Sequence, residues 1–153
     1  SFRHGDRPGM CGVGLGWEDL VVVLEDEAPI RKALVETLIG EGHMVESVAD
    51  GLSGLARFQG GGYDLVLTDL KMPVVDGFDL LAYLSRERRD VPVLVLTAFE
   101  TPEIGERLRG LGVVEVIEKP VGLARLTESI RRALDTASAS SGSRSRPSSQ
   151  ALL

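Results

Sequence analysis

Residues 20–40 read LVVVLEDEAPIRKALVETLIG. Five consecutive apolar residues come first, and an acidic turn at residues 25–27 follows them. Pro29 then stands where the first turn of a helix tolerates proline, and glycines at 40 and 42 end the segment. The helix is predicted from apolar residues spaced four apart: Ile30, Leu34 and Leu38. This stretch therefore predicts a buried strand that leads through an acidic loop into an amphipathic helix.

Four more short apolar runs, rich in β-branched residues, follow along the chain. They lie at 44–49, 64–68, 91–97 and 113–117, and each is bounded by glycine, proline or acidic residues. Such runs are typical of strands. The first, third and fourth of the five strands are apolar at consecutive positions, which is typical of strands that are covered on both faces.

Helical patterns occupy the segments between these runs. A short one spans 52–58, one begins at Asp76 and runs through 84, one begins at Thr101, and the last spans 123–134. Asp76 and Thr101 are residue types that favour helix N-caps. Alternating strands and helices predict an α/β fold, a doubly wound five-stranded parallel sheet with helices on both faces. For this length the flavodoxin-like order 2-1-3-4-5 is the leading candidate.

Length and composition narrow the class of protein. The 153 residues suit one domain, and 43% hydrophobic with 26% charged residues is typical of a folded globular chain. The net charge of −6 argues against direct nucleic-acid binding through a general basic surface. A single cysteine excludes an internal disulfide, and no apolar stretch is long enough to cross a membrane. We expect a cytoplasmic protein without a membrane anchor.

Both ends differ in composition from the middle of the chain. Residues 1–16 are rich in glycine, and residues 138–153 are rich in serine, so we predict disordered tails or linkers around a globular domain at 17–137. Met10 offers a natural start, in which case the residues before it are additions. The glycines between 12 and 16 precede the first strand, whereas a nucleotide-binding loop would follow it.

Charged and hydroxyl side chains gather where the predicted strands end. The first strand ends in Glu25-Asp26 and the third in Asp69. Because these strands are neighbours about 4.8 Å apart in the predicted order, at least three carboxylates come together, and Glu27 is assigned only to capping the helix that follows. Their mutual repulsion calls for a cation, and hard oxygen ligands suit Mg²⁺. Thr97 and Lys119 follow the fourth and fifth strands, so this rim suits formation of an aspartyl phosphate.

At this point the sequence resembles the receiver domains of bacterial two-component response regulators, over residues 20–137. Four segments carry the resemblance, in order and at strand ends: LVVVLEDEAPIR, DLVLTDLKMPVVDGFDLL, LTA and IEKP. Each motif alone is weak, but the set with this spacing is specific. The resemblance identifies 17–137 as a receiver domain.

The resemblance also implies a role for each rim residue. Asp69 would be the phosphoacceptor, Thr97 would donate to a phosphoryl oxygen, and Lys119 would pair with another. The Mg²⁺ ligands would be Asp26, Asp69, the backbone carbonyl of Lys71 and, through water, Glu25. The resemblance further implies a cis peptide bond between Lys119 and Pro120.

Two positions depart from the family pattern. Glu25 stands where the family usually has aspartate, so one arm of the acid pair is a methylene longer. Val116 stands where the family usually has tyrosine or phenylalanine, whose ring turns inward when the threonine moves toward the phosphoryl group. Val116 has no ring to turn, so coupling to partners could differ, with Phe99 contributing to the partner surface instead.

The resemblance implies a signalling switch that takes a phosphoryl group from a histidine kinase or a phosphotransfer protein onto Asp69. It would act on a downstream protein or a fused output domain, and a homodimer is an open alternative. It would be no enzyme beyond catalysing its own phosphorylation and dephosphorylation. Two alternatives stay open. One is a receiver-like scaffold that works through fixed contacts, and the other is a Mg²⁺-dependent aspartyl phosphohydrolase, which usually carries Asp-x-Asp where this chain has Glu25 and Glu27.

Overall fold

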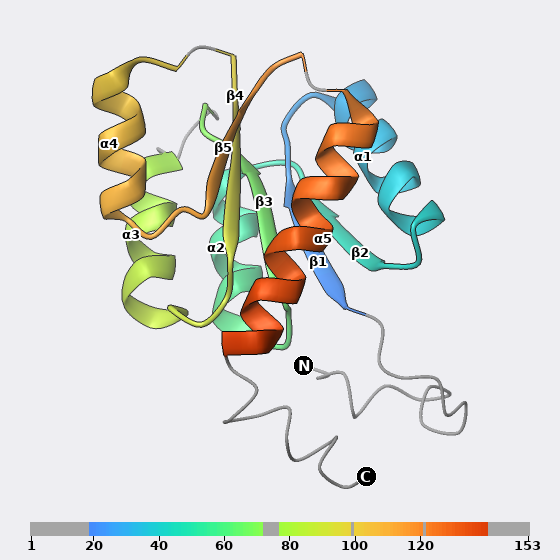
Figure 1. Ribbon diagram of the computed structural model, residues 1–153, viewed down its shortest axis with the longest axis horizontal. Coiled ribbons are helices and arrows are strands. Elements are labelled where there is room, and N and C mark those ends of the chain that lie inside the picture. The colour runs from blue at the N-terminus through green and yellow to red at the C-terminus, as the bar shows by residue number, and fades with distance from the viewer. Residues whose placement is uncertain (1–18, 72–76, 99, 121, 141–153) are drawn as a thin grey trace, which may run out of the picture.

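Strands and helices alternate along the whole described part of the chain (Figure 1). The computed structural model describes residues 19–71, 77–98, 100–120 and 122–140. The strands are β1 (Leu20–Leu24), β2 (Met44–Val48), β3 (Leu65–Asp69), β4 (Val93–Thr97) and β5 (Glu115–Glu118). The helices are α1 (Ala28–Gly40), α2 (Gly51–Gly60), α3 (Gly77–Glu87), α4 (Pro102–Gly110) and α5 (Leu123–Ser140).

The five strands form one parallel sheet in the order β2-β1-β3-β4-β5, which confirms the predicted fold class and strand order. Leu24 pairs with Thr68, so the residues that follow them, Glu25 and Asp69, lie beside each other at the end of the sheet. Thr97 pairs with Glu118 in the same way, one residue before Lys119. All these carboxyl ends lie at the upper edge in Figure 1.

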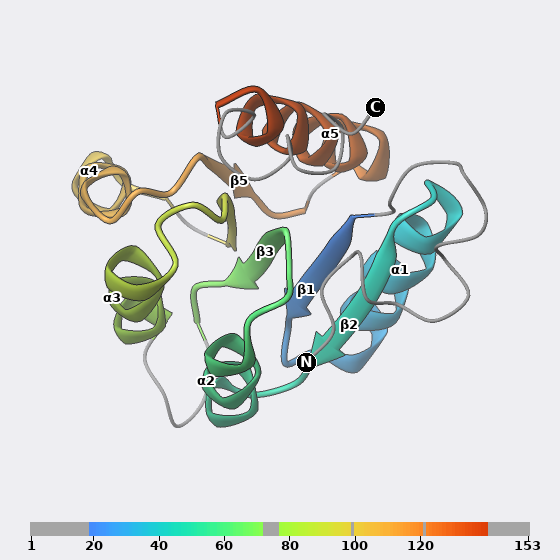
Figure 2. The same ribbon diagram turned by 90° about the horizontal axis from the view of Figure 1, so that it is seen from below.

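Alternate residues of the central strands are buried on opposite faces of the sheet, as the consecutive apolar runs predicted. One face packs against α1 and α5, and the other packs against α2, α3 and α4 (Figure 2). Val21 and Val23 pack in the apolar cluster under α1 and α5, whereas Val22 and Leu24 pack in the apolar cluster under α2, α3 and α4. All residues of β1, β3 and β4 are buried, so the loops that leave these strands start from a fixed framework.

Strand boundaries differ from the prediction by a few residues. β4 starts at Val93 and β5 at Glu115, each two residues later than predicted. Both strands start later because the residues before them belong to turns. The backbone N–H groups of Val91 and Val113 donate to the carbonyl oxygens of Arg88 and Leu108, at the ends of the preceding helical segments. β2 ends one residue earlier than predicted, and β3 is shifted one residue later, to 65–69, so that it includes Asp69.

The last helix also continues beyond the predicted start of the C-terminal tail. α5 ends at Ser140, so residues 138–140 are helical and not part of a disordered tail. The predictions for residues 1–16, 141–153, Asp76 and Phe99 fall outside the described residues. Within the described ranges, no helix combines the length and apolar character needed to cross a membrane.

Candidate functional site

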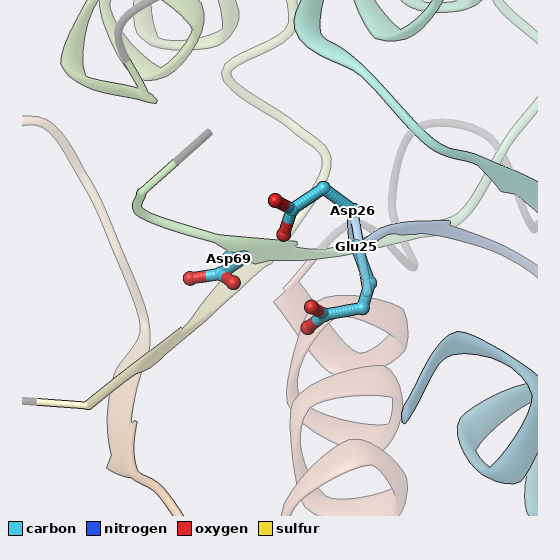
Figure 3. A group of neighbouring side chains, drawn as sticks. All are labelled: Glu25, Asp26 and Asp69. Carbon is cyan, nitrogen blue, oxygen red and sulfur yellow. The ribbon is translucent and has the colours of Figure 1, made fainter. Parts of the chain in front are cut away.

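Three carboxylates converge at the carboxyl ends of β1 and β3 (Figure 3). Glu25 and Asp26, which follow the end of β1, point to opposite sides. Each of the two, and Asp69, offers one carboxylate oxygen, and these three oxygens lie within 4.8 Å of one another. Glu25 is fully buried and Asp26 is exposed. One carboxylate of the predicted acid pair therefore faces inward, and the other faces solvent.

Lys119 lies between two of these carboxylates. Its ammonium Nζ lies 2.9 Å from Oδ2 of Asp69 and 3.2 Å from Oε1 of Glu25. The backbone N–H of Lys119 donates to the carbonyl oxygen of Thr97 at 2.7 Å, which fixes the end of β5 against the end of β4. The peptide bond between Lys119 and Pro120 is cis, as the resemblance implied. The lysine thus joins residues from three strands at one point.

Burial and charge act in opposite directions on these groups. Burial raises the pKa of the Glu25 carboxyl, and the nearby charge of Asp69 raises it further, against the backbone hydrogen bond from Glu27 and the pairing with Lys119. Burial by itself lowers the pKa of the Lys119 ammonium, but the hydrogen bonds and charges of Asp69 and Glu25 outweigh it, so that pKa is raised. Lys119 therefore stays a cation, and the effect of burial and crowded negative charge is a raised pKa of the Glu25 carboxyl.

The backbone after Asp69 folds back onto its side chain. The N–H of Lys71 donates to Oδ1 of Asp69 at 3.2 Å, while Oδ2 of Asp69 accepts from Lys119. This turn, in which an aspartate accepts from the backbone two residues later, brings the peptide of Lys71 next to Asp69. Asp69 is buried, with 6% of its surface exposed. Both carboxylate oxygens are thus held in one orientation.

The chemistry of this donor set fits a hard divalent cation. Three carboxylate oxygens within 4.8 Å of one another have a single described ammonium, Lys119, to offset them. Magnesium is bound in proteins by one or two carboxylates together with water and phosphate oxygens, and the exposed Asp26 leaves room for such ligands. The residues present are therefore suited to Mg²⁺.

The remaining predicted residues lie around this cluster. Thr97 is the last residue of β4 and is buried, and it follows Leu96, the residue that pairs with Asp69. Val116 in β5 is half-buried and packs against the apolar cluster under α2, α3 and α4. The position without an aromatic ring is therefore filled by a smaller side chain that faces the core on this side of the sheet.

Two features of the site were not predicted. Glu25 and Lys119 were each expected at this rim but not as a pair, and the longer glutamate arm is the feature that could have suggested their contact. Arg31 donates from Nη1 to the backbone carbonyl of Glu25 at 2.8 Å, and this contact was not expected either. The signal was present in the sequence, because an arginine in the first turn of a helix opposes the helix dipole and calls for another reason to be there.

Known proteins resemble this chain in sequence. The family model described as the response regulator receiver domain matches residues 21–131. The transcriptional regulatory protein TcrA of Mycobacterium tuberculosis is 40% identical over 134 residues, which cover 86% of this chain and 51% of TcrA. The chain thus spans about half the length of this curated relative.

Solved structures show the same fold. A receiver domain protein of Methanospirillum hungatei, described as CheY-like, superposes with a TM-score of 0.78 at 26% identity, covering 80% of this chain and 98% of that chain. The response regulator TrrA of Thermotoga maritima, solved in complex with Mg²⁺ and BeF, superposes with a TM-score of 0.68 at 27% identity. That match covers 75% of this chain and 98% of TrrA.

Proposed function

The chain belongs to the response regulator receiver domain family, and from this premise we propose that it is a signalling switch in which Asp69 accepts a phosphoryl group in a Mg²⁺-dependent reaction. The observation that supports this assignment best is the position of Lys119, 2.9 Å from Asp69 at the carboxyl end of the sheet. An ammonium in this place offsets negative charge on a carboxylate oxygen of Asp69 before phosphoryl transfer, and on a phosphoryl oxygen after it.

In the proposed reaction, a carboxylate oxygen of Asp69 attacks the phosphorus atom of the donor in line with the leaving group. A phosphorus–oxygen bond forms to Asp69, and the bond to the donor breaks with its electron pair leaving on the donor. Lys119 would then pair with a phosphoryl oxygen, and Thr97 would donate its hydroxyl to another. Because Glu25 also holds Lys119, the ammonium keeps one partner while Asp69 changes its charge.

We further propose that Asp26, Asp69 and the carbonyl of Lys71 hold Mg²⁺ directly, and that Glu25 assists through water. When bound, Mg²⁺ would offset the negative charge of the phosphoryl oxygens. The donor set described above supports this, and so does the similarity to TrrA, whose structure was solved with Mg²⁺. Glu25 is the least direct of these residues, since its two oxygens already contact Lys119 and the N–H of Glu27.

The proposed donor is a histidine kinase or a phosphotransfer protein, and the proposed recipient of the signal is a downstream protein or a fused output domain. TcrA is named a transcriptional regulatory protein, and about half of its length lies outside the matched region, which supports the second form of output. Turnover would be limited to the phosphorylation and dephosphorylation of Asp69 itself.

Intact-mass analysis after incubation with acetyl phosphate and Mg²⁺ tests the assignment. We expect one phosphoryl adduct on the wild-type chain and none on Asp69→Asn. Asp79→Asn is a matched control, because it removes an exposed carboxylate from α3 and should leave the adduct unchanged. An adduct retained by Asp69→Asn would place the acceptor elsewhere.

A second candidate function follows from Val116, which lacks the ring that the resemblance associates with switching. If the wild-type chain forms no adduct, a scaffold that binds partners through fixed contacts becomes the favoured function. If an adduct forms but leaves the amide NMR shifts of the described residues between 97 and 120 unchanged, phosphorylation occurs without the threonine-led switch.

A further inference from the structure

Arg31 is in contact with the acidic loop on both sides of Asp26. Its guanidinium Nη1 donates to the carbonyl oxygen of Glu25 at 2.8 Å, and its backbone N–H donates to the carbonyl oxygen of Glu27 at 2.9 Å. The second bond is an ordinary part of α1, but the first is specific to the side chain. Among the described residues, no ion pair involves Arg31, although three carboxylates lie close by in the fold.

The bond to Glu25 fixes a particular peptide group. The carbonyl of Glu25 and the N–H of Asp26 belong to one rigid plane, so a donor that holds the carbonyl also fixes the direction in which the chain enters Asp26. On either side of this plane, the N–H of Glu25 donates to Val48 at 3.2 Å and the N–H of Glu27 donates to Oε2 of Glu25 at 3.2 Å.

Asp26 itself has no comparable support. Its side chain is exposed, and within the described residues it makes no hydrogen bond or ion pair. Its position in the carboxylate cluster therefore depends on the backbone that carries it. Of the groups that hold this backbone, the Arg31 guanidinium is the side chain that acts on the peptide plane next to Asp26.

We propose that Arg31 is a positioning residue, which holds the Glu25–Asp26 peptide so that the Asp26 carboxylate is directed into the cation site; this rests on the function proposed above. Arg31 touches neither the cation nor the phosphoryl group, and it acts through the backbone of the acid pair. Residues that orient metal ligands in this indirect way typically contribute about 10-fold or more to metal affinity.

The sign of the effect separates this role from simple electrostatics. Arg31 carries a positive charge close to a cation site, so by charge alone its removal should reduce repulsion and strengthen Mg²⁺ binding. If Arg31 positions Asp26, its removal should weaken binding instead. The two explanations therefore predict opposite changes in the dissociation constant.

The test is a Mg²⁺ titration of the full, unphosphorylated chain, followed by the amide NMR shifts of residues 25–27 and 69. We expect Arg31→Met and Arg31→Gln, which lack both the charge and the reach to Glu25, to weaken Mg²⁺ binding about 10-fold. Arg31→Lys, which keeps the charge and a donor but not the planar guanidinium, should fall between these variants and the wild type. If Arg31→Met does not fold, Arg31→Gln is interpreted in the same way.

Lys32→Met is the matched control for charge. Lys32 is the next residue of α1, is exposed and is not among the described hydrogen-bond or ion-pair partners of Glu25, so its removal should leave Mg²⁺ affinity unchanged or slightly stronger. In phosphorylation by acetyl phosphate, Arg31→Met should require about 10-fold more Mg²⁺ but approach the wild-type rate at saturation.

Arg31→Met binding Mg²⁺ as tightly as the wild type, or more tightly, would overturn the proposal. If the wild-type chain itself shows no Mg²⁺-dependent shifts at residues 25–27 and 69, the proposed function fails first. The two failures are therefore distinguishable in one set of titrations.

Discussion

At the carboxyl end of the sheet three carboxylates converge and two of them share one ammonium, whereas at the amino end two guanidinium groups donate to backbone carbonyls. Arg88 donates to the carbonyls of Phe58 and Gln59 at the end of α2, and Arg57 donates to that of Gly61. The buried hydroxyl of Tyr63 also donates to Phe58, at 2.7 Å. Cations and donors at the C-terminus of a helix complement its dipole, so here the polar groups stabilise the fold.

The two ends differ in whether the polar groups pair as hydrogen-bond donors and acceptors or lie close to groups of like charge. At the amino end these donors meet backbone carbonyls near the end of α2, and the carbonyl of Phe58 accepts from Arg88, Tyr63 and the N–H of Gly61. At the carboxyl end, like charges are held together, and burial and the Asp69 charge raise the pKa of Glu25. A site that keeps unbalanced charge gives up stability that a ligand can restore. We therefore expect substitutions at the two ends to change stability in opposite directions.

Gly77→Ala should have the largest effect on stability, although Gly77 lies at the same end of the sheet as the carboxylates. A Cβ at position 77 would lie 2.2 Å from the backbone carbonyl oxygen of Leu70, which cannot move aside as a side chain could. We expect Gly77→Ala to lower the free energy of unfolding by at least about 3 kcal/mol, measured by urea denaturation. Gly77 is thus a structural residue at the otherwise functional end.

Gly110→Ala is the matched control for this substitution. Gly110 is also helical, but a Cβ there would meet nothing within 4 Å. Because alanine favours a helix over glycine by about 1 kcal/mol, Gly110→Ala should be neutral or stabilising. Equal stability of the two variants would contradict the close approach of Gly77 to Leu70.

Tyr63→Phe tests the amino end. It removes the hydroxyl that donates to Phe58 and leaves the ring in place, so it should lower the free energy of unfolding by about 1 kcal/mol without affecting phosphorylation. Tyr83→Phe is the control, since among the described residues the Tyr83 hydroxyl makes no hydrogen bond, and it should change little. A loss of phosphorylation in Tyr63→Phe at full folding would show that the two ends are coupled.

Asp26→Asn should have the opposite sign. In Mg²⁺-free buffer it removes one of three crowded negative charges, and we expect a gain of up to about 1 kcal/mol in the free energy of unfolding. Added Mg²⁺ should stabilise the wild type but not the variant, which thermal unfolding with and without the ion would measure. A destabilised Asp26→Asn without Mg²⁺ would contradict the description of this end as electrostatically strained.

The pH dependence of stability should show the smallest effect. The pKa of Glu25 is raised in the folded state, so between its ordinary value of 4.5 and the raised value the folded chain binds more protons than the unfolded chain. The contribution of Glu25 to stability therefore falls as pH increases through this interval. In Mg²⁺-free denaturation, Glu25→Gln should lose less stability than the wild type over that range.

Asp50 provides the contrasting case for this measurement. The N–H of Ser53 donates to its carboxylate at the start of α2 and lowers the pKa of Asp50. The contribution of Asp50 to the free energy of unfolding is therefore present above the ordinary pKa of aspartate and is lost as pH falls through the lowered value. Asp50→Asn should remove a dependence on pH of the opposite sign to that of Glu25.

Much of this architecture could be predicted because it depends on local patterns. Consecutive apolar residues in three strands required cover on both faces, and the alternation with helices required parallel strands. The parallel order then placed Glu25, Asp26 and Asp69 at one edge. The strand starts at 91 and 113 were predicted too early, because apolar valines in turns look like strand residues until their N–H groups are seen to bond to the preceding helical turn.

Strand polarity and apolar patterning are local properties, so residue patterns alone specify which side chains reach the carboxyl end of the sheet. How these groups share their partners depends instead on the packing of separate elements in the folded chain. The pairing of Lys119 with Glu25 spans 94 positions, and the approach of Gly77 to Leu70 depends on how α3 meets β3. Such contacts depend on distances of a few tenths of an ångström between separate elements, which packing fixes and residue patterns do not encode.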